Sequence, residues 1–129
     1  MNYIADTHAL LWHFTGHPAL SEKAKTLFQQ CEKGECLIFI PSIVMAECLS
    51  IFDKKKVRFD FKALFERVRK SENYVMIALD DTILQMMIDV TEVTEIHDKI
   101  IAATAKFLGV PLVTKDEVLQ SVAKITTVW

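Results

Sequence analysis

Short apolar runs that alternate with helical patterns constrain the fold of this 129-residue chain more than any other feature. Each run is continuous rather than alternating, which is typical of a strand that is covered on both faces. The runs predict strands at residues 3–5, 36–40, 74–79 and 110–113, and more weakly at 125–128. The intervening patterns predict helices at residues 7–14, 21–33, 42–55, 61–70, 81–90, 98–108 and 117–122.

This alternation indicates a parallel sheet, because right-handed crossovers place the connecting helices on both of its faces. A chain of this length suits one hydrophobic core, and only three Gly and three Pro interrupt it. The sequence therefore predicts a single α/β domain, residues 1–129, with a three-layer α/β/α architecture and a central parallel sheet.

The composition narrows the class of protein. Apolar residues make up 51% of the chain, yet no apolar run approaches the roughly 20 residues that cross a bilayer. No export signal is visible at the start of the sequence, so a soluble, cytoplasmic protein is expected. The net charge of −2 argues against indiscriminate binding to nucleic acid. Three cysteines match neither a zinc site nor a redox pair and are expected as buried thiols: Cys31, Cys36 and Cys48.

Four acidic residues stand at junctions in otherwise apolar stretches: Asp6, Glu47, Asp98 and Asp116. Asp6 directly follows the first predicted strand, where open α/β sheets keep their ligands. Asp116 can approach it if the first and fourth strands are neighbours, while Glu47 and Asp98 would reach the same edge from helices. Carboxylates offer the hard oxygen ligands that Mg²⁺ and Mn²⁺ prefer. The sequence therefore predicts a divalent cation site.

Three of these acids also have an explanation without a cation. Glu47 is the sole charged residue between Pro41 and Phe52, and an internal salt bridge to a Lys or Arg would account for it. Asp98 and Asp116 could each cap a helix, a role worth about 1 kcal/mol that needs no catalytic duty.

Other polar residues are less specific. Asp80 and Asp81 are interpreted as the cap and first turn of the helix at 81–90. Four histidines are expected to face solvent or to pack rather than to bind zinc: His8, His13, His17 and His97. One basic run is either a solvated helix end or a contact to phosphate: Lys54, Lys55, Lys56 and Arg58.

Four segments of the chain resemble the PIN-domain ribonucleases of the VapC toxin type. They follow that family's order and spacing: residues 6–12 (DTHALLW), 41–47 (PS leading to AE), 97–105 (HDKIIAATA) and 109–116 (GVPLVTKD). The similarity spans residues 4–116, and its most specific part runs from Asp98 to Asp116.

The resemblance implies a compact α/β/α domain that holds Mg²⁺ or Mn²⁺ and cleaves RNA, commonly as a homodimer that a cognate antitoxin inhibits. It gives the metal-binding and catalytic roles to the four acids, and it adds the hydroxyl groups of Thr7 and Thr114. Glu95 stands where relatives often carry an additional Asp, and Lys99, a further candidate RNA contact, stands where Arg is frequent. Both differences keep the charge, so they concern substrate detail more than chemistry.

The expected reaction is hydrolysis of RNA phosphodiester bonds by water that the cation activates. Asp6 and Asp116 are expected as direct ligands, with Glu47 and Asp98 as ligands or as groups that orient the water. Two alternatives stay open: a phospho-acceptor signalling module, and a PIN-like scaffold without catalytic activity that only binds partners. The expected homodimer would use apolar surface around residues 20–28 or 51–65.

Overall fold

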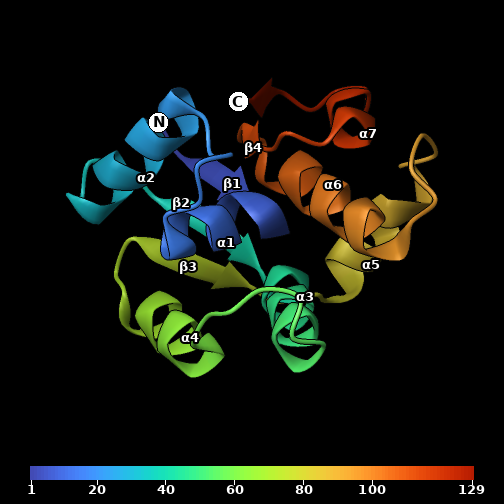
Figure 1. The fold of residues 1–129 in the computed structure, drawn as a ribbon. Helices are drawn as coiled ribbons and strands as arrows, with labels where there is room; N and C mark the ends of the chain where they lie inside the picture. Colours follow the sequence, from blue (N-terminus) through green and yellow to red (C-terminus); the bar gives the residue numbers. More distant parts are fainter.

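Five strands and seven helices make up the fold, and the computed structural model describes residues 1–129 (Figure 1). The strands are β1 (Tyr3–Ala5), β2 (Ile38–Pro41), β3 (Tyr74–Ile77), β4 (Leu112–Val113) and β5 (Thr127–Val128). The helices are α1 (Thr7–Thr15), α2 (Glu22–Glu32), α3 (Ser42–Asp53), α4 (Phe61–Lys70), α5 (Asp81–Ile88), α6 (Ile96–Leu108) and α7 (Glu117–Gln120). Every predicted element is present. None of the helices combines the length and the apolar character that crossing a membrane requires.

The strands form one parallel sheet in the order β3-β2-β1-β4-β5. The central strand β1 runs between β2 and β4, and Ala5 lies opposite Val113. The first and fourth strands are therefore neighbours, as an approach of Asp6 to Asp116 requires. Their carboxyl ends meet at one edge of the sheet, where ligands bind in open α/β folds.

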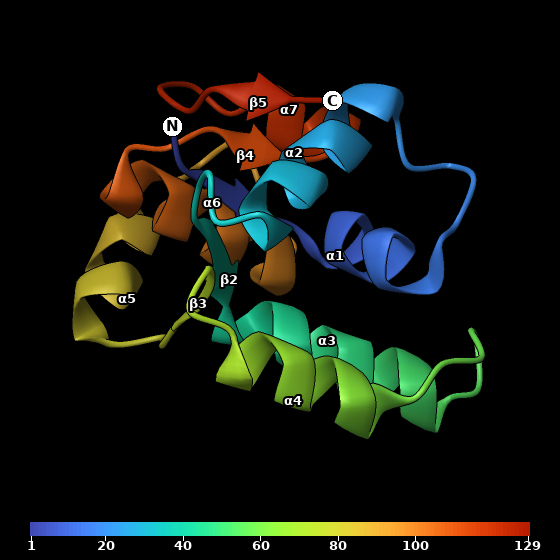
Figure 2. The same ribbon diagram turned by 90° about the vertical axis from the view of Figure 1, so that its left-hand side faces the viewer.

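Helices cover both faces of the sheet, so the predicted α/β/α architecture with a central parallel sheet is confirmed. In Figure 2, α5 and α6 lie on one side of the strands and α1 lies on the other, while α3 and α4 pack side by side. The strands are thereby buried on both faces: Ile4, Ile38, Ile40 and Leu112 have no exposed surface.

All three cysteines are free thiols in buried positions, as predicted. Burial raises the pKa of the Cys31 thiol to about 11 and that of the Cys48 thiol to about 12. Both thiols therefore stay protonated near neutral pH and pack as small apolar side chains.

The apolar face of α2 is not free to bind a partner. Ala24, Leu27 and Phe28 are buried in the core of their own chain. Residues 20–28 therefore leave little apolar surface for the predicted dimer, because their helical pattern reflects internal packing.

Candidate functional site

Asp6 lies at the end of β1, where it caps α1 and contacts β4. Its Oδ1 accepts a hydrogen bond from the Ala9 backbone N–H at 2.9 Å, and its Oδ2 accepts one from the Thr114 hydroxyl. Only 6% of Asp6 is exposed. Burial raises the pKa of the Asp6 carboxyl, although the bonds from Thr114 and Ala9 oppose that shift. A buried acid with both oxygens held is positioned more firmly than a cap alone requires.

Asp116 joins this site from the end of β4. Its backbone N–H donates to the Thr114 hydroxyl oxygen at 3.0 Å, so Thr114 connects the two acids. Asp116 Oδ1 also accepts hydrogen bonds from the backbone of Val118 and Leu119 and thereby caps α7. The predicted cap is present, and it uses only one of the two carboxylate oxygens. Capping therefore does not prevent Asp116 from binding a cation.

Glu47 reaches the same edge from α3. Its Oε1 accepts a hydrogen bond from the Thr7 hydroxyl at 2.6 Å, and its Oε2 lies 4.0 Å from His97 Nδ1. No Lys or Arg forms an ion pair with it. The alternative of an internal salt bridge to a Lys or Arg is therefore wrong.

Asp98 lies in the first turn of α6, but Glu95 is the residue that caps this helix. Glu95 Oε2 accepts a hydrogen bond from the Asp98 backbone N–H at 2.8 Å, and Glu95 Oε1 lies 2.6 Å from His97 Nδ1. That hydrogen bond to Glu95 raises the pKa of His97. The capping explanation of Asp98 is thus wrong, because α6 begins two residues before the predicted start.

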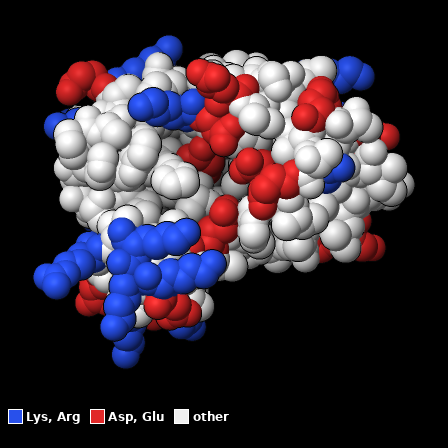
Figure 3. Space-filling model, turned by 45° about the vertical axis from the view of Figure 1, so that its right-hand side comes forward, with Lys and Arg blue, Asp and Glu red and all other residues white.

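The Asp98 carboxyl reports how close the acids lie to one another. Burial, followed by the negative charges of Asp116, Glu95, Glu47 and Asp6, raises its pKa to about 6. These four acids come from separate parts of the sequence, and all of them lie close enough to Asp98 to disfavour its negative charge. In Figure 3, Asp and Glu side chains form a band across one face, with Lys and Arg side chains clustered below it.

The chemistry of these donors fits a hard divalent cation. Their oxygens come from carboxylates and two threonine hydroxyls, and no Lys or Arg pairs with any of the four predicted acids. However, no three His, Cys, Asp or Glu side chains converge closely enough to hold an ion as they stand. The donor set thus has the right composition, and binding would require the side chains to move together.

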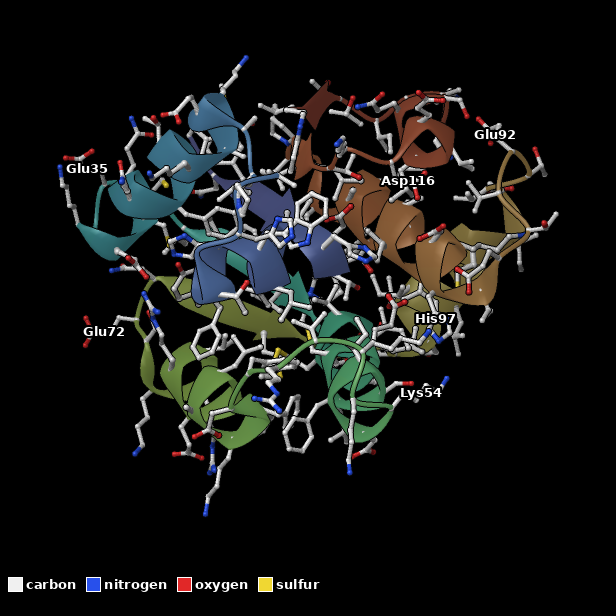
Figure 4. All side chains as sticks on the ribbon, viewed as in Figure 1. Glu35, Lys54, Glu72, Glu92, His97 and Asp116 are labelled. Carbon is white, nitrogen blue, oxygen red and sulfur yellow. The ribbon has the colours of Figure 1, made fainter.

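A cavity of about 390 Å³ extends from Glu47 towards the basic run. Its polar lining comes from α1, α3, the segment after α3, and α6: His8, Glu47, Ser50, Lys54, Lys56 and His97. In Figure 4, the labelled Asp116, His97 and Lys54 follow one another down one side of the molecule. Lys55 and Arg58 do not line this cavity, so only part of the predicted basic run faces it. Lys99 is half-buried near the start of α6.

A second cavity, of about 300 Å³, lies directly against Asp6 and Asp116. The other residues that line it are His8, Ala9, Trp12, Lys115 and Trp129. The sequence contained a signal for Trp12, because residues 8 and 12 lie one helical turn apart on the helix that Asp6 caps. No local pattern indicated Trp129, whose position depends on the pairing of β5 with β4.

The β3-β2-β1-β4-β5 parallel sheet, with acids gathered beyond β1 and β4, defines an α/β/α protein of the PIN type. Residues 3–125 match the sequence profile of the PIN domain, and the chain belongs to this family. No curated protein matches the chain.

Solved structures show the same fold. VapBC2 from Rickettsia felis, bound to a DNA fragment from its promoter, is similar with a TM-score of 0.75 and 17% identity, over 99% of this chain and 98% of the other. FitAcB from Neisseria gonorrhoeae has a TM-score of 0.65 and 17% identity, over 97% and 95%. PAE2754 from Pyrobaculum aerophilum has a TM-score of 0.59 and 16% identity, over 98% and 92%.

Proposed function

We propose that this PIN domain protein is a metal-dependent endoribonuclease, and that it is the toxin of a toxin–antitoxin pair. The observation that carries the proposal is the set of four carboxylates from β1, α3, α6 and β4 that no Lys or Arg neutralises. Asp6 is buried and the other three acids are half-buried, and negative charges gathered there are costly unless a cation joins them. Mg²⁺ or Mn²⁺ suits these oxygens.

The four acids have different roles in this proposal. Asp6 and Asp116 would hold the cation, since Thr114 connects them and each keeps coordinating capacity. Glu47 and Asp98 would complete the set or orient the attacking water. When bound, the cation would lower the pKa of that water and neutralise negative charge on the scissile phosphate.

Thr7 and Thr114 have positioning roles in this proposal. Each hydroxyl donates a hydrogen bond to one carboxylate, Thr7 to Glu47 and Thr114 to Asp6. These bonds fix the position of one oxygen of each acid. Lys54 and Lys56 are proposed to bind the RNA backbone, because both line the cavity that begins at Glu47.

The toxin assignment rests on the VapC-like segments of the sequence. The similarity in fold to VapBC2 and FitAcB supports it. A cognate antitoxin and a second copy of the chain are proposed as partners, in the cytoplasm. A short upstream reading frame for a small DNA-binding protein would support the toxin role, whereas its absence would favour a housekeeping nuclease.

The phospho-acceptor alternative is disfavoured by the sheet. Such a module needs an acceptor Asp at the end of a middle strand together with a separate acid pair at another strand end. Here Asp6 is the only acid directly after the middle strand β1, β2 ends at Pro41, and β3 is an edge strand. Asp80, which follows β3, caps α5 through the Ile83 backbone N–H. A scaffold without activity remains the alternative, and an assay decides between it and a nuclease.

The direct test is an RNA cleavage assay with the purified protein. Mixed structured RNAs should be cut when Mg²⁺ or Mn²⁺ is present and should stay intact in EDTA. Asp98→Asn, which keeps the shape of the side chain and removes its charge, serves as the matched variant and should be inactive. Cleavage that persists undiminished in EDTA would contradict the metal mechanism. No cleavage under any metal condition would favour the scaffold.

A further inference from the structure

We propose that the cavity lined by His8, Trp12, Lys115 and Trp129, here called the tryptophan pocket, binds one unstacked base of a single-stranded RNA next to the scissile phosphate. The inference rests on the proposed nuclease function and deepens it by naming the form of the substrate. It concerns side chains that have no role in holding a cation.

The tryptophan pocket is built from flat rings whose positions are already set. His17 stacks on Trp12 with 5.1 Å between ring centroids, and Trp129 meets Trp12 edge-on at 6.0 Å. His8 adds a third neighbour of Trp12 at 5.6 Å. A platform that is held in this way loses little freedom when a flat ligand stacks on it.

Lys115 gives the tryptophan pocket a charged rim. Its Nζ lies 5.8 Å from the centre of the Trp12 ring, and it forms no ion pair with any carboxylate. A ligand that carries both an aromatic ring and a phosphate would satisfy the Trp rings and this ammonium together. A nucleotide has that combination.

The position of the pocket determines which nucleotide it would bind. Asp6 and Asp116 form part of its wall, so a base in the pocket belongs to a nucleotide at or beside the candidate centre. On the other side of His8 and Trp12, the larger cavity leads to Lys54 and Lys56. The two cavities therefore offer one strand a path past the acids, with its backbone near the lysines and a base against the tryptophans in the tryptophan pocket.

The size of the pocket favours a single strand. A cavity of about 300 Å³ is at the small end of the range for ligand pockets, and it admits one ring system. Bases in a duplex stay stacked on each other, whereas loops and single strands can place a base on an aromatic side chain. The expected substrates are therefore single strands and loops.

Tryptophan fluorescence tests the proposal directly, because the chain has only two tryptophans and both line the pocket. The full-length protein in EDTA is titrated with a mixed-sequence single-stranded RNA, with the same RNA as a duplex, and with an RNA that carries abasic positions. EDTA separates binding from the proposed chemistry. The single strand should quench the fluorescence, whereas the duplex and the abasic strand should not.

Variants locate the effect. Trp12→Ala and, independently, Trp129→Ala should each raise the Kd for the single strand by roughly 5- to 100-fold, as expected when one stacking contact is lost. Trp12→Phe should recover most of the affinity. The control is Phe107→Ala, which removes a half-exposed aromatic side chain that does not line the pocket, and it should leave the Kd unchanged.

Two results would overturn the pocket: equal quenching by duplex and single strand, or an unchanged Kd in both Trp→Ala variants. Either result together with normal metal-dependent cleavage would reject the pocket and leave the nuclease intact. Quenching and variant effects as expected, in a protein that cleaves nothing with Mg²⁺ or Mn²⁺, would support the pocket and reject the nuclease.

Discussion

Asp6 combines a structural task with a proposed chemical one, and a single substitution separates them. Asn caps helices as well as Asp does, so Asp6→Asn keeps the hydrogen bond from Ala9 and removes the charge. Its amide nitrogen then faces the Thr114 hydroxyl and donates to it, where the Asp6 carboxylate accepts from it. Because burial and Asp116 disfavour that charge, we expect the metal-free variant to be as stable as the parent or more stable. It should not cleave RNA, and Mg²⁺ should stabilise it much less than the parent.

Thermal melts with and without Mg²⁺ measure this effect. The parent should gain about 2.7 kcal/mol at a metal concentration 100 times the dissociation constant, and Asp6→Asn should lose most of that gain. A metal-free variant that is clearly less stable than the parent would show that Asp6 is a structural acid. So would a variant that keeps the full stabilisation by Mg²⁺.

The lysines after α3 allow a comparison between neighbours. Lys54 and Lys56 line the larger cavity and Lys55 does not, so only the first two are expected to contact phosphate. Each such contact to a single strand should contribute about 0.7 to the slope of log K against log salt. The double variant Lys54→Ala/Lys56→Ala should flatten the slope for RNA binding, while Lys55→Ala should not. Equal slopes in all three proteins would assign the whole run to a solvated surface.

At the scale of elements, His13 on α1 couples the packing of three helices to pH. Its ring stacks on Phe28 of α2 at 4.4 Å, and its Nε2 lies 3.2 Å from Glu32, an acid that also pairs with Arg67 of α4. Burial, followed by the Arg67 charge, lowers the pKa of His13 from 6.5 to about 4. The folded protein thus keeps His13 neutral.

This lowered pKa predicts a loss of stability in weak acid. The unfolded chain binds a proton at His13 below about pH 6.5, whereas the folded protein does not until about pH 4, so the stabilisation is present above 6.5 and is lost as the pH falls towards 4. The loss should be on the order of 2 kcal/mol. His13→Phe keeps the stacked ring, so its denaturant midpoint should fall less between pH 7 and pH 4.5. Parallel losses in both proteins would contradict this role of His13.

The elements were predictable because this sheet is covered on both faces, so that each strand leaves a continuous apolar run. The prediction that Asp6 and Asp116 share a site followed from the rule that the carboxyl ends of parallel strands lie at the same edge of the sheet. Glu95 shows the limit of such reasoning. It lies three residues before Asp98, the predicted cap, and only the backbone shows which of the two caps α6. Trp129 shows another limit, because a contact between distant strands leaves no local pattern.

At the scale of the whole molecule, the exposed apolar surface suggests where a second copy binds. Ile88 is 74% exposed, and Ile96 and Leu84 are 52% and 50% exposed, all on α5 and the start of α6. By comparison, Phe52 in the predicted 51–65 region is 42% exposed. Clusters of exposed apolar side chains mark interaction sites. We therefore expect the homodimer to form through α5.

Sedimentation at micromolar concentration checks the dimer. The parent should have the mass of two chains, and Ile88→Lys should shift it to one chain because a buried lysine without a partner is disfavoured. Phe52→Lys is the matched control on the other surface and should leave the dimer intact. A parent with the mass of one chain would contradict the dimer. A shift caused by Phe52→Lys alone would move the interface to α3.

The candidate site cannot assemble until late in protein synthesis, because it depends on the pairing of β1 with β4. Asp6 leaves the ribosome early, but the hydroxyl that holds it belongs to Thr114, 108 residues later in the chain. Until β4 docks beside β1, Asp6 and Asp116 have no common edge on which to meet. For a nuclease of the proposed kind, the site would therefore be assembled only after residue 116 has been synthesised and β4 has paired with β1.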